Sequence, residues 1–178
     1  MTLAGRAQID EFESMFRDYR KPVFNLLLRM TGSHDRALDL TQEVFVRALQ
    51  GWAELRDRAR VRGWIFRIAR NVALRGMDQD RRGRTEPLES VAGVLESTEA
   101  RPDEQFMQQE EKRALQRALD SLPTGMRLVL LLRDMEGLEY RQIAQVLGCS
   151  EGTVASRLSR ARQLVGRKLA DSKIERSR

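Results

Sequence analysis

Residues 138–158, near the C-terminal end, constrain the fold of this chain more than any other stretch. Two amphipathic segments lie on either side of Gly148, a residue type that readily adopts the left-handed conformation of a tight turn. Ala144 is small enough for two short helices to cross closely, and Ser150 is a good N-cap for the second helix. The apolar residues that would fill the angle between the helices are Ile143, Leu147, Val154 and Leu158. This spacing predicts a helix-turn-helix.

The outward face of the second helix carries small or polar side chains and one arginine. Its members are Gly152, Ala155, Ser156, Ser159, Arg160 and Gln163. Small side chains let a helix approach base edges in a major groove, and arginine can read guanine there. Thr153, Arg157 and Arg162 flank this face, within reach of phosphates. The face predicts binding to duplex DNA, although a helical hairpin that binds nothing could carry the same apolar spacing.

Helical periodicity also runs through the rest of the chain, and no segment shows the sustained alternation of a strand. We expect a first helix around Phe12 to Tyr19 and a second one opening at Pro22, because proline fits the first turn of a helix. Ser33 is a candidate N-cap for a third helix. The apolar stripe of that helix holds Ala37, Leu38, Thr41, Phe45, Ala48 and Leu49. The fold class predicted is all-α.

The composition changes between the two ends of the chain. Residues 85–107 contain two prolines, a glycine and mainly acidic charges, with weak periodicity. Such a composition is typical of a linker that buries little apolar surface. We therefore predict two small helical domains, residues 1–84 and residues 108–178, joined by a flexible acidic linker.

Charge is unevenly distributed over the 178 residues. The chain has 32 basic and 26 acidic residues, a net charge of +6. Residues 54–84 carry +6, residues 85–140 carry −6, and residues 141–178 carry +6. Two basic blocks separated by an acidic one indicate two contacts with a polyanion such as a phosphate backbone. A solvated surface is the alternative interpretation.

Several classes of protein are disfavoured. With one cysteine, Cys149, and one histidine, His34, the chain has no internal disulfide and no expected metal site or other cofactor. It lacks a glycine-rich phosphate loop and a set of nucleophile, histidine and acid, so an enzyme is not expected. No apolar run is long enough to span a membrane, and no secretory signal precedes the first helix. We expect a cytoplasmic protein.

Four segments, in order along the chain, resemble those of bacterial extracytoplasmic-function (ECF) sigma factors. Residues 39–45, Asp-Leu-Thr-Gln-Glu-Val-Phe, resemble the signature D-L-x-Q-E-x-F of that family. Residues 64–71 resemble its W-L-x-x-I-A-x-N segment, and Leu122-Pro123 and the helix-turn-helix from Tyr140 to Arg162 resemble its C-terminal domain. The central domain of longer sigma factors has no counterpart here, which is the ECF pattern.

The resemblance implies that the helix after Ser33 binds core RNA polymerase. The residues assigned to this contact are Asp39, Leu40, Gln42, Glu43 and Arg47. Their polar members form one face of an otherwise apolar helix, which suits a partner helix. Without the resemblance, the same face would be interpreted as merely solvated.

The resemblance further implies that residues 52–62 and the following helix bind the promoter −10 element as a melted strand. The residues assigned are Arg56, Arg58, Arg60, Arg62, Arg67, Arg70 and Asn71. Clustered arginines are typical of a groove for single-stranded nucleic acid, and an amide can read a base edge. Trp52 and Trp64 could stack on bases, but tryptophan at helical spacing lies more often in a core.

The helix-turn-helix would read the −35 element as duplex DNA. The residues assigned are Thr153, Ala155, Ser156, Arg157, Ser159, Arg160 and Arg162. Ala155 stands where many family members carry a basic residue, and Glu139 stands where they often have a serine or threonine cap. The resemblance also implies control by an anti-sigma factor. A stand-alone helix-turn-helix regulator would explain residues 138–167 but not the N-terminal segments, and it would bind DNA without polymerase.

Overall fold

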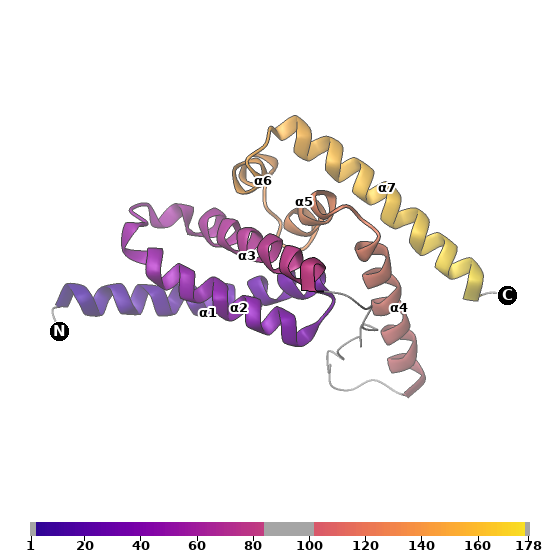
Figure 1. Ribbon diagram of the computed structural model, residues 1–178, viewed down its shortest axis with the longest axis horizontal. Coiled ribbons are helices and arrows are strands. Elements are labelled where there is room, and N and C mark those ends of the chain that lie inside the picture. The colour runs from indigo at the N-terminus through magenta and orange to yellow at the C-terminus, as the bar shows by residue number, and fades with distance from the viewer. Residues whose placement is uncertain (1–2, 84–101, 177–178) are drawn as a thin grey trace.

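The computed structural model describes residues 3–83 and 102–176, and it confirms the all-α prediction because this part of the chain has no strand. Figure 1 shows the helices in two groups, one built from each end of the chain. The elements in order are α1 (Leu3–Thr31), α2 (His34–Gly51), the short 3-10 turns η1 (Trp52–Glu54) and η2 (Arg58–Arg60), α3 (Val61–Gly83), α4 (Pro102–Asp120), α5 (Thr124–Asp134), α6 (Tyr140–Leu147) and α7 (Glu151–Arg176).

Helices α1, α2 and α3 pack against one another around an apolar core. Helix α3 packs closely against α2 at Gly76, where a Cβ atom would lie 2.9 Å from a methyl carbon of Leu40. The residues buried between the three helices include Val23, Leu26, Leu27, Met30, Ala37, Leu40, Val44, Ala48, Ile65, Phe66, Ala69, Val72 and Ala73. This bundle places the outer face of α2 and the first turns of α3 at the surface.

The predicted break at Pro22 is wrong, because α1 runs through it without interruption. Proline removes one helical hydrogen bond and crowds the preceding turn, which disfavours a helix interior. Met15 on one side of Pro22 and Val23 on the other are both buried in the core. Packing of one continuous helix against α2 and α3 thus outweighs the local preference of proline.

The apolar stripe predicted for α2 is correct in part. Ala37, Thr41, Phe45 and Ala48 are buried, but Leu38 and Leu49 are exposed. Leu40 and Val44 are buried as well, so the inner face follows the spacing of three or four residues that a helix imposes. Helix α2 therefore has more apolar side chains than its core requires. Its start is as predicted, since the Ser33 side chain accepts a hydrogen bond from the Arg36 amide.

Helices α4 to α7 form the second group. Helix α4 begins at Pro102, several residues before the predicted end of the linker, because proline followed by two acidic residues favours a helix start. The rest of the predicted linker lies outside the described residues. Gly137 and Gly148 adopt positive φ angles of 64° and 65° at the turns after α5 and α6, and for Gly148 this is the tight-turn conformation predicted from the sequence.

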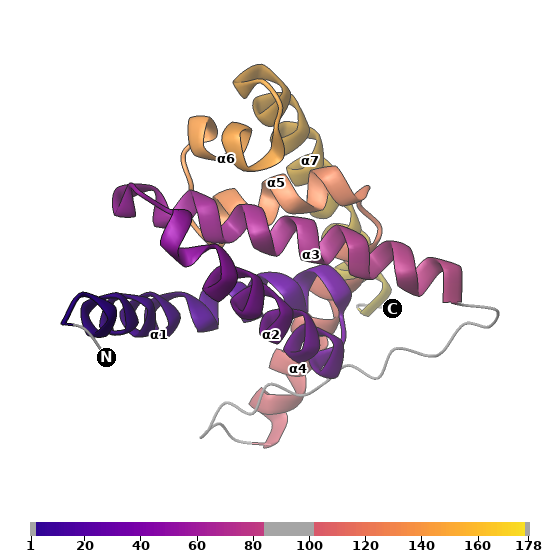
Figure 2. The ribbon, with the colours of Figure 1, turned by 60° about the vertical axis from the view of Figure 1, so that its left-hand side comes forward.

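The two groups of helices lie against each other. Helix α3 contacts α6, while the C-terminal half of α1 contacts α4 and α5. Figure 2 shows α3 between the α1–α2 layer on one side and α5 and α6 on the other. The face of α3 opposite the N-terminal core is thereby partly covered by the C-terminal group.

Candidate nucleic-acid and protein interfaces

Helices α6 and α7 form the predicted helix-turn-helix. Ala144 is 8% exposed at the crossing, and Gly148 ends α6 in the left-handed conformation. The Ser150 hydroxyl accepts a hydrogen bond of 3.1 Å from the Thr153 amide, so Ser150 caps α7 as expected. Ile143, Leu147, Val154 and Leu158 are all buried between the helices. Helix α6 begins with the Gln142 side chain accepting a hydrogen bond from the Glu139 amide at 2.9 Å, in place of a serine or threonine cap.

The outward face of α7 is open to solvent. Its exposed members are Gly152, Ala155, Ser156, Ser159, Arg160 and Gln163, whereas Thr153 and Arg157 are half-buried. The Ser156 hydroxyl donates to the Thr153 carbonyl at 3.1 Å, within the helix. Small side chains around Arg160 leave this face flat enough to enter a major groove. The structure thus brings the sequence-predicted duplex-binding residues together on one helix.

Arg162 already has a partner within the protein. Its guanidinium contacts the Asp134 carboxylate of α5 at 2.5 and 3.2 Å. The hydrogen bond that Arg162 donates to the Asp134 carboxylate raises the pKa of Arg162, as an adjacent anion should. Sequence analysis missed Asp134, since 28 residues separate the two partners.

The residues assigned to single-stranded DNA divide into two sets. Arg56, Arg60, Arg67 and Asn71 are exposed, and Asn71 accepts a hydrogen bond of 3.1 Å from half-buried Arg70. These residues lie on the loop before α3 and along its first three turns. Trp64 is half-buried beside buried Trp52, with ring centroids 6.1 Å apart.

Arg58 and Arg62 are engaged inside the molecule. Arg58 contacts residues of α1 and of its own loop. The Arg62 guanidinium donates to the main-chain carbonyl of Glu136, in the turn between α5 and α6. Burial raises the pKa of the Glu136 carboxyl and nearby Arg62 partly counteracts that. Burial likewise raises the pKa of Tyr19, with Arg62 again opposing the shift. Arg62 therefore lies between α1 and the C-terminal group.

The residues assigned to polymerase lie on α2. Asp39 and Gln42 are exposed, and half-buried Glu43 and Arg47 form an ion pair with a closest distance of 2.6 Å. Leu40 is only 2% exposed and packs against Gly76, so its side chain belongs to the core and not to the presented face.

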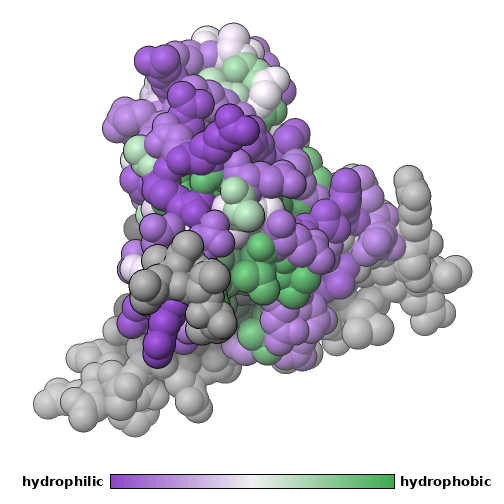
Figure 3. Space-filling model, turned by 90° about the vertical axis from the view of Figure 1, so that its left-hand side faces the viewer, coloured by the Kyte–Doolittle hydropathy of each residue, from purple (hydrophilic) through white to green (hydrophobic). Residues whose placement is uncertain are grey.

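Helices α1 and α2 carry exposed apolar side chains that were not predicted to be exposed. They are Ile9 and Phe16 of α1 and Leu38, Val46 and Leu49 of α2, of which Leu49 is the most exposed at 60%. Figure 3 shows a green apolar area surrounded mainly by purple hydrophilic residues on the face turned to the viewer. The excess of apolar residues on α2 was the available signal, because one helix face cannot bury them all.

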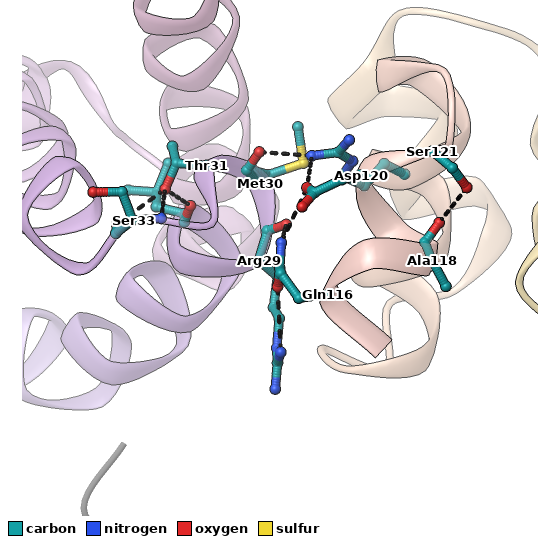
Figure 4. Close-up of polar contacts among 10 residues, drawn as sticks. Arg29, Met30, Thr31, Ser33, Gln116, Ala118, Asp120 and Ser121 are labelled. Carbon is teal, nitrogen blue, oxygen red and sulfur yellow. Dashed lines mark hydrogen bonds and ion pairs between the residues drawn. The ribbon is translucent and has the colours of Figure 1, made fainter. Parts of the chain in front are cut away.

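A polar interface joins the end of α1 to α4 and α5 (Figure 4). The Gln116 side chain accepts from Arg29 at 3.3 Å and donates to the Arg29 carbonyl at 3.2 Å. Arg127, 6% exposed, donates to the Met30 carbonyl at 2.8 Å and pairs with Asp120 at 3.0 Å. The last carbonyls of a helix lack partners within it, so these donors from the C-terminal group complete the end of α1.

Within residues 3–83 and 102–176, no group of three or more potential metal ligands is found. A search of the same part of the chain finds no helix long and apolar enough to cross a membrane.

These features define a class: an all-helical protein with a helix-turn-helix at one end and a second arginine-rich surface at the other. Residues 15–83 match the family model of sigma-70 region 2, and residues 112–165 match that of sigma-70 region 4. The two matches fall on the two groups of helices.

Whole-chain relatives agree with this class. The chain is 29% identical over 166 residues to the RNA polymerase sigma factor YlaC of Bacillus subtilis, covering 93% of this chain and 96% of the relative. It is 30% identical over 159 residues to the ECF RNA polymerase sigma-E factor of Escherichia coli K12, covering 85% and 82%. The chain therefore belongs to the ECF sigma factors, a family of transcription initiation factors.

A solved structure has the same fold. It is the sigma factor RpoE of Bartonella quintana in complex with the anti-sigma factor NepR, with a TM-score of 0.74 and 23% identity, covering 90% of this chain and 97% of that one. The likeness extends over both groups of helices.

Proposed function

We propose that this protein binds core RNA polymerase through α2, directs it to promoters by reading the −35 element with α7, and helps melt the −10 element with α3 and the loop before it. The single observation that carries the proposal is the pair of family matches in order on one chain, each over a group of helices with an open polar or basic face. Residues 1–84 and the segment from the start of α4 onward would be the two working domains, joined by an acidic linker.

Two further aspects belong to the same proposal. The factor acts in the cytoplasm, where polymerase and promoters are, and it has no enzymatic activity of its own. An anti-sigma factor holds it inactive, and the apolar surface of α1 and α2 is available for such a partner. The Bartonella relative, solved in complex with an anti-sigma factor, supports this control by analogy.

The test is binding of the purified protein to core polymerase that lacks any sigma factor. We expect tight, saturable binding that competes with the primary sigma factor. Reversing the charge of Asp39 and Glu43 to lysine should weaken it at least roughly tenfold, since like-charge contacts in an interface cost more than 1 kcal/mol. Glu111→Lys, an exposed reversal on α4, is the matched control. Circular dichroism checks that each variant is folded.

Each other outcome has a definite meaning. No binding to core polymerase, together with specific binding to duplex DNA, would indicate a stand-alone regulator and contradict the proposal. Equal loss of affinity in the Glu111 control would show that net charge, and not the α2 face, governs binding.

A further inference from the structure

The loop between α2 and α3 is built around the side chain of Arg58. One terminal nitrogen, Nη1, donates to the main-chain carbonyls of Trp52 at 3.0 Å and Leu55 at 2.5 Å. The Nε atom donates to a carboxylate oxygen of Glu11 on α1 at 3.1 Å. The guanidinium carbon lies 4.0 Å from the centre of the Trp52 ring, a cation–π distance. Arg58 thus joins both ends of η1 to α1.

Helix α1 also contacts this loop through Trp52. The Trp52 indole nitrogen donates to the Gln8 carbonyl at 3.3 Å, and the Phe12 ring meets the Trp52 ring edge to face at 5.5 Å. Trp52 is only 6% exposed. Gln8, Glu11 and Phe12 all precede residue 15, where the region 2 match begins. These contacts are therefore a feature of this chain beyond the matched segment.

The neighbouring arginines differ from Arg58. Arg56 is exposed, and Arg60 is 82% exposed in an ion pair with Asp57 at 3.0 Å. The Arg58 side chain is 34% exposed, and its Nη1 and Nε atoms donate to two carbonyls and a carboxylate. A guanidinium has a fixed planar set of donors, and those directed at the loop cannot also bind a phosphate.

We propose that Arg58, together with Glu11 and Trp52, is a positioning residue that fixes the shape of the −10-binding loop, while Arg56 and Arg60 contact the DNA strand. This inference rests on the proposed function for its DNA target. Lysine cannot replace Arg58, because one ammonium cannot reach both carbonyls, the carboxylate and the ring face in the same geometry.

For Glu11, the proposal predicts an effect on DNA binding that is opposite to the effect expected from its charge alone. Removing a negative charge near a DNA site should leave binding unchanged or strengthen it if only electrostatics matter. If Glu11 acts by holding Arg58, Glu11→Gln should instead weaken sequence selection. Arg58→Lys should do the same, and the double variant should lose no more than either single variant, because residues that act as one unit are not additive.

The experiment uses holoenzyme reconstituted from core polymerase and each variant, incubated with a single-stranded DNA pool with a randomised centre. Sequencing before and after capture gives the enrichment, and titration in several salt concentrations gives the salt dependence. We expect Glu11→Gln and Arg58→Lys each to reduce enrichment roughly threefold to tenfold, with an unchanged salt slope. Arg56→Ala and Arg60→Ala should weaken binding to every sequence and lower the slope by about one. Glu13→Gln, the same charge change at an exposed neighbour, is the control.

Amide hydrogen exchange of residues 53–60 in the free protein is the second readout. Faster exchange in Glu11→Gln and Arg58→Lys, but not in Glu13→Gln, supports the proposal. Unchanged exchange in both variants would overturn the proposal. So would normal enrichment in Glu11→Gln combined with a loss of affinity and a reduced salt slope in Arg58→Lys, because Arg58 would then be a direct phosphate contact. If wild-type holoenzyme selects no sequence, the proposed function fails, and the exchange measurement still decides whether Glu11 and Arg58 hold the loop.

Discussion

Among single residues, Arg162, which the sequence predicts to contact DNA, forms an ion pair within the protein. The Asp134 carboxylate binds the guanidinium that the sequence predicts to contact a phosphate. We predict that Asp134→Asn tightens binding to duplex DNA by roughly twofold to fivefold, the equivalent of releasing one exposed ion pair. Fluorescence anisotropy with a labelled duplex measures the dissociation constant.

Net charge alone must be separated from the release of Arg162. Asp171→Asn makes the same charge change at an exposed position of α7, and it should alter affinity less. An equal gain in both variants would mean that Asp134 does not restrain Arg162 in solution. Because the pair is exposed, melting temperatures should change little in either variant.

At the level of elements, the approach of α3 to α2 depends on the missing side chain of Gly76. A Cβ atom there would lie 2.9 Å from a Leu40 methyl carbon and 3.3 Å from an Arg36 nitrogen. We predict that Gly76→Val lowers the free energy of unfolding by roughly 1–3 kcal/mol through overpacking. Gly63→Ala, on the same helix with open space around it, should raise that energy by up to about 1 kcal/mol because alanine favours helix. Urea unfolding followed by circular dichroism measures the free energy of unfolding of both variants. If both substitutions raised it, the prediction would be wrong, and α2 and α3 would have room for the valine side chain between them.

The same elements show what the sequence could predict. The helix-turn-helix followed from local signals, since Gly148 and Ser150 each act within a few residues of themselves. The break at Pro22 was wrong because packing of α1 against two other helices is invisible to local preference. The faces of α2 were misjudged because helical spacing permits two overlapping apolar stripes. The packing of α1 and α3 against α2 selects the stripe with Leu40.

The engaged arginines were beyond sequence analysis for a different reason. Arg58 meets Glu11 across 47 residues and Arg62 meets Glu136 across 74 residues. The composition places Arg58 and Arg62 in a basic block of the sequence. The composition of that block does not predict which of its arginines has a partner inside the protein. That information lies in the tertiary fold alone.

For the whole molecule, the contact between the two groups of helices is polar at the end of α1. Gln116 donates a hydrogen bond to the Arg29 carbonyl and Arg127 donates one to the Met30 carbonyl (Figure 4). Arg62 donates to the carbonyl of Glu136. Buried apolar residues of both groups also belong to one cluster, so polar and apolar contacts together hold the groups against each other. Separation of the two groups would release Arg62 from the Glu136 carbonyl.

Arg127 offers the most direct test of this interface. Arg127→Met keeps most of the side-chain volume but removes the donor to Met30, which should cost about 1–3 kcal/mol. We predict a larger radius of gyration by small-angle X-ray scattering and faster amide exchange in the first turn of α3. Arg117→Met, at an exposed position of α4, should change neither. A lower melting temperature with unchanged scattering would instead assign Arg127 to the packing of its own group through Asp120, and the two groups would then be held together mainly by the contact of α3 with α6.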